Sequence, residues 1–244
     1  MTPYTQHHLL AQEFQDPRLQ ETFQAETDLL LTKILQTKAH SIMDFGCGDG
    51  RTIRNLVPEI AVERVGQEKR TSIYGVDFDR DLIERAHKLT THSSGVYDLI
   101  YFRDIVKKGV DQRQDSWDMA YSTHNTLGGL RVFMPNDRQA FVNEMARIVR
   151  PGGLVTNMTW KQDDSTTEFL EQYYSAIGFD IEYMTPGTTL VRSTINGERF
   201  EFARIHPRGM GYTYKAAGLV NPATEEVGPL WVAVTAQVQE VTGE

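Results

Sequence analysis

The chain contains one cysteine, Cys47, among 244 residues, so no internal disulfide can form. This cysteine usage is typical of a reducing compartment, and we expect the protein to be cytoplasmic. No apolar run is long enough to cross a bilayer, and residues 1–8 lack the basic and apolar regions of a secretory signal. We therefore expect neither a membrane partner nor export.

Basic residues are also scarce. Lys and Arg number 25 against 33 Asp and Glu, which gives a formal charge of −8 at pH 7. Such a surface repels phosphate backbones, and the basic residues form only short pairs such as Lys107-Lys108, so nucleic acid is not an expected partner. The chain has neither an H-x-x-x-H nor a C-x-x-C pattern, so no metal site is expected.

The most informative segment is residues 44–50, Asp-Phe-Gly-Cys-Gly-Asp-Gly, which directly follow the apolar run 41–43. A strand that ends in a carboxylate and passes into alternating glycines brings bare backbone close to a ligand. The spacing is G-x-G-x-G, because Arg51 stands where the dinucleotide fingerprint G-x-G-x-x-G has its third glycine. Such a turn can simply reverse the chain, so residues at other strand ends are needed to decide its role.

Apolar segments and helical repeats alternate along the chain as far as residue 160. Residues 19–35 carry apolar side chains at helical spacing, and further helices are expected after the first, second and fourth strands. Strands that alternate with helices predict an α/β fold with a mostly parallel sheet and right-handed crossovers. The expected strands are 41–45, 72–77, 96–102, 117–122, 154–160 and 231–238.

The region after residue 160 has a different pattern. Asn196-Gly197 lies between the β-prone segments 190–195 and 198–205 and predicts a hairpin with a two-residue turn. Arg204 shares the apolar face of this hairpin and could bind an anionic acceptor, but a solvated strand end is the preferred interpretation. The turn predicts the cross-strand pairs Ile195–Glu198, Ser193–Phe200, Val191–Phe202 and Arg192–Glu201.

Polar groups fall at the ends of the first four predicted strands. They are Asp44, Asp77, Asp104 and the run 122–125, Ser-Thr-His-Asn. Ligands of open α/β sheets bind outside the carboxyl ends of the strands, where Asp77 could accept both hydroxyls of a ribose and Asp104 an adenine amino hydrogen. A pocket with this many carboxylates suits a nucleoside without phosphates, because a pyrophosphate would be repelled.

Together these segments resemble the class I S-adenosylmethionine-dependent methyltransferases. The resemblance is carried by residues 42–50, 74–78, 103–105 and 147–153, and it covers roughly residues 20–160 with the last helix and strand. It implies a doubly wound, mostly parallel seven-stranded sheet, a Rossmann-like methyltransferase fold, with a small antiparallel β lid. The expected parts are a cofactor-binding core with an N-terminal helix (1–160), a lid over the substrate site (161–206), and a last helix and strand (207–244).

The resemblance also implies roles for individual residues. Asp77 would bind the ribose, although a helix cap is its alternative role, and Cys47 would be a small residue against the cofactor. The glycine turn would contact the methionine part, Phe78 one face of the adenine, and Asp104-Ile105 the adenine edge. The cofactor-binding residues expected on this basis are Asp44, Gly46, Cys47, Gly48, Asp77, Phe78, Asp104, Ile105 and Ser122.

The loop after the fourth predicted strand is where family members place groups that face the methyl acceptor. His124 could take a proton from the acceptor, since imidazole has an ordinary pKa of about 6.5, and Asn125 could orient an amine or carbonyl. A hydrogen-bonded loop histidine and a turn-forming asparagine are the alternatives. Residues 124–129 resemble a loop of several small-molecule N-methyltransferases. We therefore expect in-line methyl transfer to a nitrogen, and in second place an oxygen, of a small molecule.

Two other functions fit the same cofactor pattern. A non-catalytic S-adenosylmethionine-binding partner or scaffold would keep the cofactor pocket, but the polar run 122–125 argues against it. A nucleic-acid methyltransferase would need a basic groove, which the charge balance disfavours. Formation of a methylated product would distinguish an enzyme from a binding protein.

Overall fold

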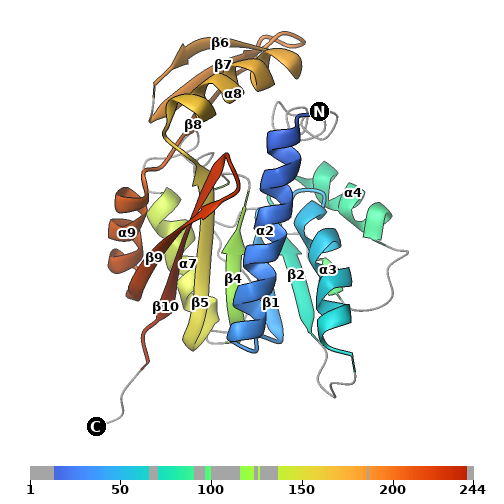
Figure 1. Ribbon diagram of the computed structural model, residues 1–244, viewed down its shortest axis with the longest axis vertical. Coiled ribbons are helices and arrows are strands. Elements are labelled where there is room, and N and C mark those ends of the chain that lie inside the picture. Colours follow the sequence, from blue (N-terminus) through green and yellow to red (C-terminus); the bar gives the residue numbers. More distant parts are fainter. Residues whose placement is uncertain are drawn as a thin grey trace.

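The computed structural model describes residues 14–65, 71–90, 97–99, 116–123, 126, 137–185 and 187–240. Seven strands of this part form one large sheet in the order β3-β2-β1-β4-β5-β10-β9 (Figure 1). β1 to β5 run parallel, whereas β10 is antiparallel to both of its neighbours, which confirms the expected mostly parallel seven-stranded sheet. The strands are β1 (Ser41–Phe45), β2 (Ser72–Val76), β3 (Tyr97–Leu99), β4 (Trp117–Ser122), β5 (Val149–Trp160), β9 (Leu219–Val227) and β10 (Trp231–Val238).

Helices cover both faces of the large sheet, as in a doubly wound fold (Figure 1). On one face α2 (Pro17–Gln36) and α3 (Arg51–Glu63) bury Leu30, Ile34 and Leu56. On the other face α7 (Asp137–Ile148) and α9 (Pro207–Ala216) bury a separate apolar cluster. The helix α4 (Arg80–Thr90) joins β2 to β3, and its Ile83 belongs to the cluster beneath α2 and α3. Among the described residues, none of the helices combines the length and apolarity that a bilayer crossing requires.

A second, three-stranded sheet lies beyond the carboxyl end of β5 (Figure 1). This small sheet has the order β6-β7-β8, and it is preceded by α8, whose N-cap is Asp163. The ring of Trp160 lies 5.9 Å from Phe169 of α8 and 5.5 Å from Trp231 of β10, so an aromatic cluster joins the small sheet to the core. The elements are α8 (Asp164–Ala176), β6 (Phe179–Met184), β7 (Thr188–Ser193) and β8 (Arg199–Ala203).

The predicted hairpin forms between β7 and β8, but its predicted register is wrong by two residues. Val191 lies opposite Phe200, not Phe202. The turn is longer than two residues, because the amide of Ser193 donates to the carbonyl of Glu198 at 2.9 Å. A shift of two residues keeps every side chain on its face, so Phe200 and Phe202 still face the apolar interior.

The register shift changes the polar face of the hairpin. Arg192 lies opposite Arg199 instead of Glu201. The like charges are compensated from β6, where Asp180 lies 3.1 Å from Arg192 and Glu182 lies 2.8 Å from Arg199. The third strand of the small sheet therefore supplies the acids that the predicted hairpin alone would have needed.

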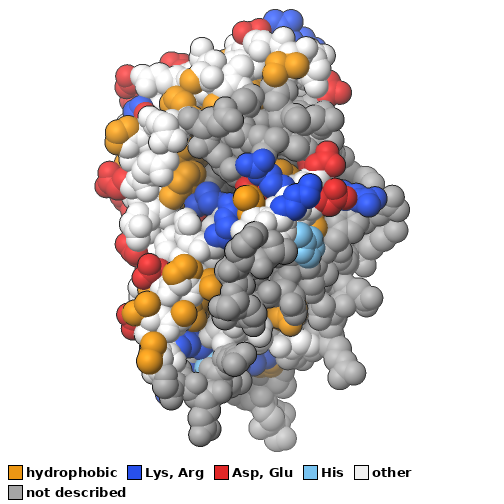
Figure 2. Space-filling view, turned by 90° about the vertical axis from the view of Figure 1, so that its right-hand side faces the viewer, with side chains coloured by type: hydrophobic (Ala, Val, Ile, Leu, Met, Phe, Trp, Pro, Cys, Tyr) orange, Lys and Arg blue, Asp and Glu red, His pale blue; other side chains and the backbone are white. Residues whose placement is uncertain are grey.

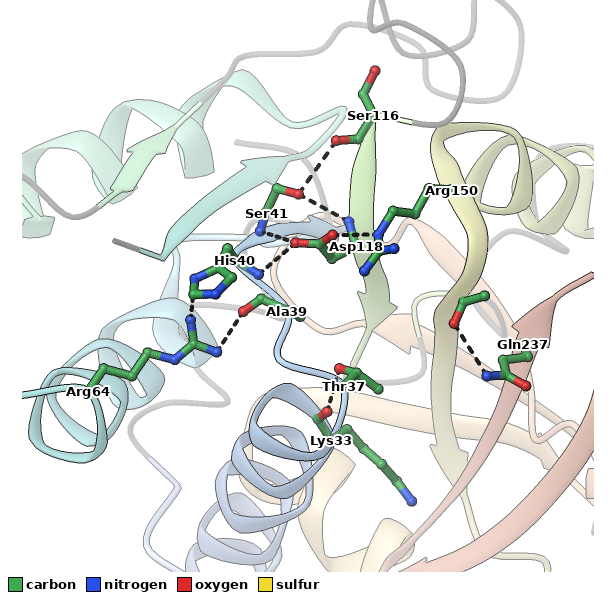
Figure 3. Close-up of polar contacts among 11 residues, drawn as sticks. Lys33, Thr37, Ala39, His40, Ser41, Arg64, Ser116, Asp118, Arg150 and Gln237 are labelled. Atoms are coloured by element: carbon green, nitrogen blue, oxygen red, sulfur yellow. Dashed lines mark hydrogen bonds and ion pairs between the residues drawn. The ribbon is translucent and has the colours of Figure 1, made fainter. Parts of the chain in front are cut away.

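A hydrogen-bonded network holds the amino ends of the parallel strands together (Figure 3). These strand ends point away from the small sheet (Figure 1). Asp118 of β4 accepts hydrogen bonds from the amides of His40 and Ser41, at 2.6 and 2.9 Å, and from Arg150 Nε at 2.6 Å. Burial would raise the pKa of Asp118, but these hydrogen bonds outweigh burial and hold the pKa below its ordinary value. One carboxylate thus joins β1, β4 and β5.

Candidate active site

The glycine turn that follows β1 requires glycine on steric grounds. The amides of Gly46 and Cys47 donate to the carbonyl of Val76 at 2.8 and 3.1 Å, which joins the turn to the end of β2. A Cβ on Gly46 would lie 2.4 Å from the side chain of Thr126. Positive φ angles occur at all three glycines of the turn, 76° at Gly46, 56° at Gly48 and 79° at Gly50.

Asp77, at the end of β2, connects this turn to the next helix. Its Oδ2 accepts a hydrogen bond from the Gly48 amide at 2.8 Å, and its Oδ1 accepts one from the Asp79 amide at 2.9 Å. Asp79, not Asp77, caps α4, because its carboxylate accepts from the amides of Asp81 and Leu82. The helix-cap interpretation therefore does not explain Asp77, whose carboxylate is buried beside the glycine turn.

Cys47 packs its thiol inside the turn, against the backbone of the neighbouring strand. A Cβ on Gly75 of β2 would lie 2.7 Å from Cys47 Sγ, so the two small residues fit together. Burial, and then the negative charge of Asp77, raise the pKa of the Cys47 thiol well above its ordinary value. The thiol is therefore unsuited to act as a nucleophile.

Asp44 is fully buried, and neither of its carboxylate oxygens has a hydrogen-bond partner among the described residues. Burial, and then the negative charge of Glu26, raise its pKa well above the ordinary value, and the nearby Tyr121 hydroxyl and Arg51 only partly oppose this shift. A charged carboxylate without partners is costly to bury, so burial favours the protonated form of Asp44 until a positive charge approaches.

Glu26 of α2 is a site residue that the sequence analysis missed. Its carboxylate is fully buried and binds Arg51 Nη2 at 2.9 Å and the Thr52 hydroxyl at 2.7 Å. Arg51 also lies over the ring of Phe23, 3.9 Å from its centroid, while its Nη1 is buried without a partner in the described chain. The sequence signal was an acid on the apolar face of α2, four residues before Leu30.

Ser122 ends β4 with its side chain buried and its Oγ without a described partner. It pairs in register with Asn157 of β5, whose amide nitrogen donates to the Tyr214 hydroxyl at 2.7 Å. That hydroxyl donates in turn to the carbonyl of Val234 at 2.8 Å, so the amide orientation is fixed and Asn157 Oδ1 is left without a described partner. Two polar oxygens are therefore available at neighbouring strand positions.

Arginines from α3 and α4 gather on one face, where basic side chains lie among acidic ones below the small sheet (Figure 2). Arg54 and Arg85 both lie 3.5 Å from the buried carboxylate of Asp49, and Arg80 pairs with Glu84 at 2.9 Å. These arginines are thus compensated by neighbouring acids, and the sequence had given no sign of their gathering.

The structure brings most of the expected cofactor-binding residues to one place, the carboxyl ends of β1, β2 and β4. Phe78 lies there partly exposed, between Asp77 and the start of α4. Asp104, Ile105, His124 and Asn125 lie outside the described residues. The expected residues found together are Asp44, Gly46, Cys47, Gly48, Asp77, Phe78 and Ser122.

Comparison with known families identifies this arrangement. Residues 42–153 match the model of a family described as a methyltransferase domain. The match runs from β1 through the glycine turn and Asp77 to the segment that follows α7. Residues 42–153 thus carry a methyltransferase domain, and the chain is a methyltransferase. The resemblance of residues 42–50 and 74–78 to the class I S-adenosylmethionine-dependent methyltransferases implies S-adenosylmethionine as the cofactor.

Solved structures share the methyltransferase's fold at low sequence identity, which shows the fold alone. A protein from Pyrococcus horikoshii OT3 has a TM-score of 0.68 at 16% identity, covering 93% of this chain and 94% of that one. An S-adenosylmethionine-dependent methyltransferase from Clostridium acetobutylicum ATCC 824 has a TM-score of 0.61 at 11% identity, covering 89% and 92%. A comparison with curated protein sequences found no match.

A third structure was solved with ligands. It is a 1,6-didemethyltoxoflavin-N1-methyltransferase from Burkholderia thailandensis, with bound 1,6-didemethyltoxoflavin and S-adenosylhomocysteine. Its TM-score is 0.57 at 12% identity, covering 90% of this chain and 79% of that one.

The buried polar groups of the methyltransferase fit the methionine half of this cofactor, which carries an ammonium and a carboxylate. Among the described residues, Asp44 offers an acceptor without a partner, and Arg51 Nη1 and Ser122 Oγ offer donors without partners. Unpartnered buried groups are rare in folded proteins, and here they gather beside the glycine turn. A zwitterion would satisfy groups of both signs.

Proposed function

We propose that the methyltransferase moves a methyl group to a nitrogen of a small molecule, with an oxygen as the second candidate atom. The observation that carries this proposal is the polar loop that begins at Ser122, because residues 124–129 resemble a loop of small-molecule N-methyltransferases. The Burkholderia thailandensis protein, an N1-methyltransferase by name, adds support at the level of the fold. The formal charge of −8 disfavours a nucleic-acid substrate.

The cofactor-binding roles follow from charge and position. Asp44 would pair with the ammonium of the cofactor and Arg51 Nη1 with its carboxylate, since these are the unpartnered groups of matching sign. Asp77, held by the Gly48 and Asp79 amides, would accept the ribose hydroxyls with its remaining lone pairs. When bound, S-adenosylmethionine supplies the electrophilic methyl group.

The acceptor would lie next to the loop that follows Ser122. Thr123 and Thr126 are buried and linked by hydrogen bonds of 3.1 Å from the Thr126 amide and 2.8 Å from its hydroxyl to the Thr123 carbonyl. His124 and Asn125 lie between these two threonines in the sequence. His124 would accept a proton from the acceptor, and Asn125 would orient it.

Rate enhancement would come mainly from alignment of the two reactants, an effect that can supply roughly 7–11 kcal/mol of a barrier. We assign water exclusion to residues 161–206, which contain α8 and the small sheet and act as a lid. Residues 1–160 would form the cofactor-binding core, and residues 207–244 would complete it. The aromatic cluster around Trp160 supports the lid assignment, because it fixes α8 to the large sheet.

A product screen tests the proposed function. Purified protein is incubated with isotopically labelled S-adenosylmethionine and a metabolite extract, and labelled products are identified by mass spectrometry. We expect a labelled N-methyl product. Labelled O-methyl products alone would refute the nitrogen assignment, and labelled nucleic acid would refute the small-molecule assignment.

The role of His124 has its own test. The variant His124→Ala should lower turnover more than it weakens cofactor binding, and the acidic limb of the pH–rate profile should be lost. An unchanged pH–rate profile would remove His124 from the mechanism.

A further inference from the structure

Arg204 follows β8 and is buried, whereas its sequence position suggested a solvated strand end. Its amide donates to the carbonyl of Gly187 at 3.1 Å, and its carbonyl accepts a hydrogen bond from the Gln162 side chain. The next amide, that of Ile205, donates to the Thr159 hydroxyl near the end of β5 at 3.3 Å. Arg204 is therefore held where the small sheet joins the carboxyl edge of the large sheet.

The guanidinium of Arg204 has more N–H groups than it has hydrogen-bond acceptors among the described residues. Nη1 donates to the Thr167 hydroxyl at 2.8 Å and Nη2 donates to the carbonyl of Thr185, while Nε is buried without a described partner. A guanidinium has five N–H groups, so the Nε–H and further Nη hydrogens remain for a ligand. An Nε–H beside an Nη–H forms the fork that matches two oxygens of one anion.

The charge of Arg204 is not compensated by contact. In the described part of the chain no carboxylate comes within ion-pair distance of the guanidinium, and Asp163 acts on it only from further away. The Asp163 carboxylate is instead committed to the N-cap of α8, where it accepts from the Thr166 amide at 2.7 Å. A buried charge without a contacting partner is costly, so an anion at this place would be favoured.

Two buried hydroxyls lie on the elements that adjoin Arg204. Thr189 of β7 pairs with Phe202, so its side chain lies on the sheet face that α8 covers, and a diagonal neighbour on that face is Arg204. Thr166 lies in the first turn of α8 on the buried side. The Oγ1 atoms of both threonines are fully buried without described partners. Thr166 is the sequence neighbour of Thr167, whose hydroxyl binds Arg204, so three buried polar groups on adjoining elements lack partners in the described part of the chain.

We propose that Arg204, Thr166 and Thr189 form a subsite for an oxyanionic group, a carboxylate or phosphate, of the methyl acceptor. The assignment to the acceptor rests on the proposed small-molecule function. The guanidinium fork would bind two oxygens, and each hydroxyl would donate one further hydrogen bond. A bound water could satisfy the hydroxyls but would leave the positive charge uncompensated.

Anion binding tests the subsite without knowledge of the acceptor. The native protein is titrated calorimetrically with sodium acetate and with sodium phosphate, at an ionic strength held constant with sodium chloride. We expect saturable binding of one of these anions at one site. The preferred anion indicates whether the acceptor carries a carboxylate or a phosphate, and heat changes indistinguishable from those of added chloride would overturn the proposal.

Variants locate the binding. Thr189→Val and Thr166→Val each remove one unpartnered hydroxyl with little change in shape, so the fold should persist while the anion dissociation constant rises about tenfold. Arg204→Lys keeps the charge but loses the fork, and it should weaken binding by a similar factor or more. If the two valine variants bind the anion as tightly as the native protein, the subsite is not where we place it.

A control separates loss of the subsite from loss of stability. Thr156→Val removes a buried hydroxyl that is partnered by Thr235 at 3.0 Å in the large sheet, so it should destabilise the fold without changing anion affinity. S-adenosylmethionine binding is measured in parallel. Native protein that binds the cofactor but neither anion contradicts the subsite alone, whereas anion binding with no methylated small molecule contradicts the proposed function alone.

Discussion

Replacement of Asp44 by asparagine tests the electrostatic design of the cofactor site. In the free protein the pKa of Asp44 is raised well above its ordinary value, so the folded state keeps a proton that the unfolded chain loses above about pH 4. Stability attributable to this group is complete below that pH and falls as the pH rises toward the raised pKa. The expected slope is about 1.4 kcal/mol per pH unit for one proton.

Asp44→Asn is neutral at every pH and has nearly the same shape. Its free energy of unfolding should therefore match that of the native protein near pH 4 and exceed it increasingly toward neutral pH. Urea unfolding at a series of pH values measures the difference, and unchanged m-values show that the two states are comparable. Parallel stability curves for the two proteins would show that Asp44 is not protonated in the fold.

The same variant should lose affinity for S-adenosylmethionine, because the ammonium loses its counter-charge. A hydrogen bond to a charged group is worth about 1.5–3 kcal/mol, so the dissociation constant should rise roughly 10- to 160-fold. Calorimetry in buffers of different ionisation enthalpy should show proton release on binding to the native protein and none with the variant. Asp118→Asn is the matched control: the Asp118 pKa is lowered, so its loss should cost stability at neutral pH but leave cofactor affinity unchanged.

Three further outcomes follow from the packing around the site. Gly75→Ala places a Cβ 2.7 Å from Cys47 Sγ and should lower the free energy of unfolding by about 1–3 kcal/mol, as measured by urea unfolding. The double variant with Cys47→Ala should recover part of that loss. Tyr214→Phe removes the hydroxyl that bridges Asn157 and the Val234 carbonyl. It should lower the free energy of unfolding by about 1–3 kcal/mol in the same assay, and a smaller loss would mean that water replaces the hydroxyl. Asp77→Ala should abolish cofactor binding in calorimetry while far-ultraviolet circular dichroism stays unchanged, and undiminished binding would refute the ribose assignment.

The parallel core was predictable from sequence because its strands are buried runs bounded by glycines and acids. β9 was missed since it is an edge strand with Pro222 in its middle and exposed Thr and Glu residues, features that protect an edge from pairing and hide its strand character. The hairpin was found from Asn196-Gly197, but its register depends on β6, whose acids neutralise Arg192 and Arg199. Such a contact from a third strand is invisible to a local turn rule.

The placement of candidate residues was predictable where they directly follow a strand of the parallel core. The glycine turn and Asp77 belong to this class. Glu26 was missed because an acid on an amphipathic helix is normally solvated, and only tertiary packing against Arg51 makes its burial tolerable. Arg204 was misjudged for the same reason, since α8 covers the strand end that bears it.

The buried thiol of Cys47 allows opening of the glycine turn to be measured in the native protein by the rate of thiol labelling. A thiol reagent that attacks thiolates should react very slowly with native protein, because the group is both shielded and hard to deprotonate. The labelling rate then measures how often the glycine turn opens to solvent. A methyl donor bound against that turn would slow the labelling, so alkylation followed by mass spectrometry would read occupancy without any assay of catalysis.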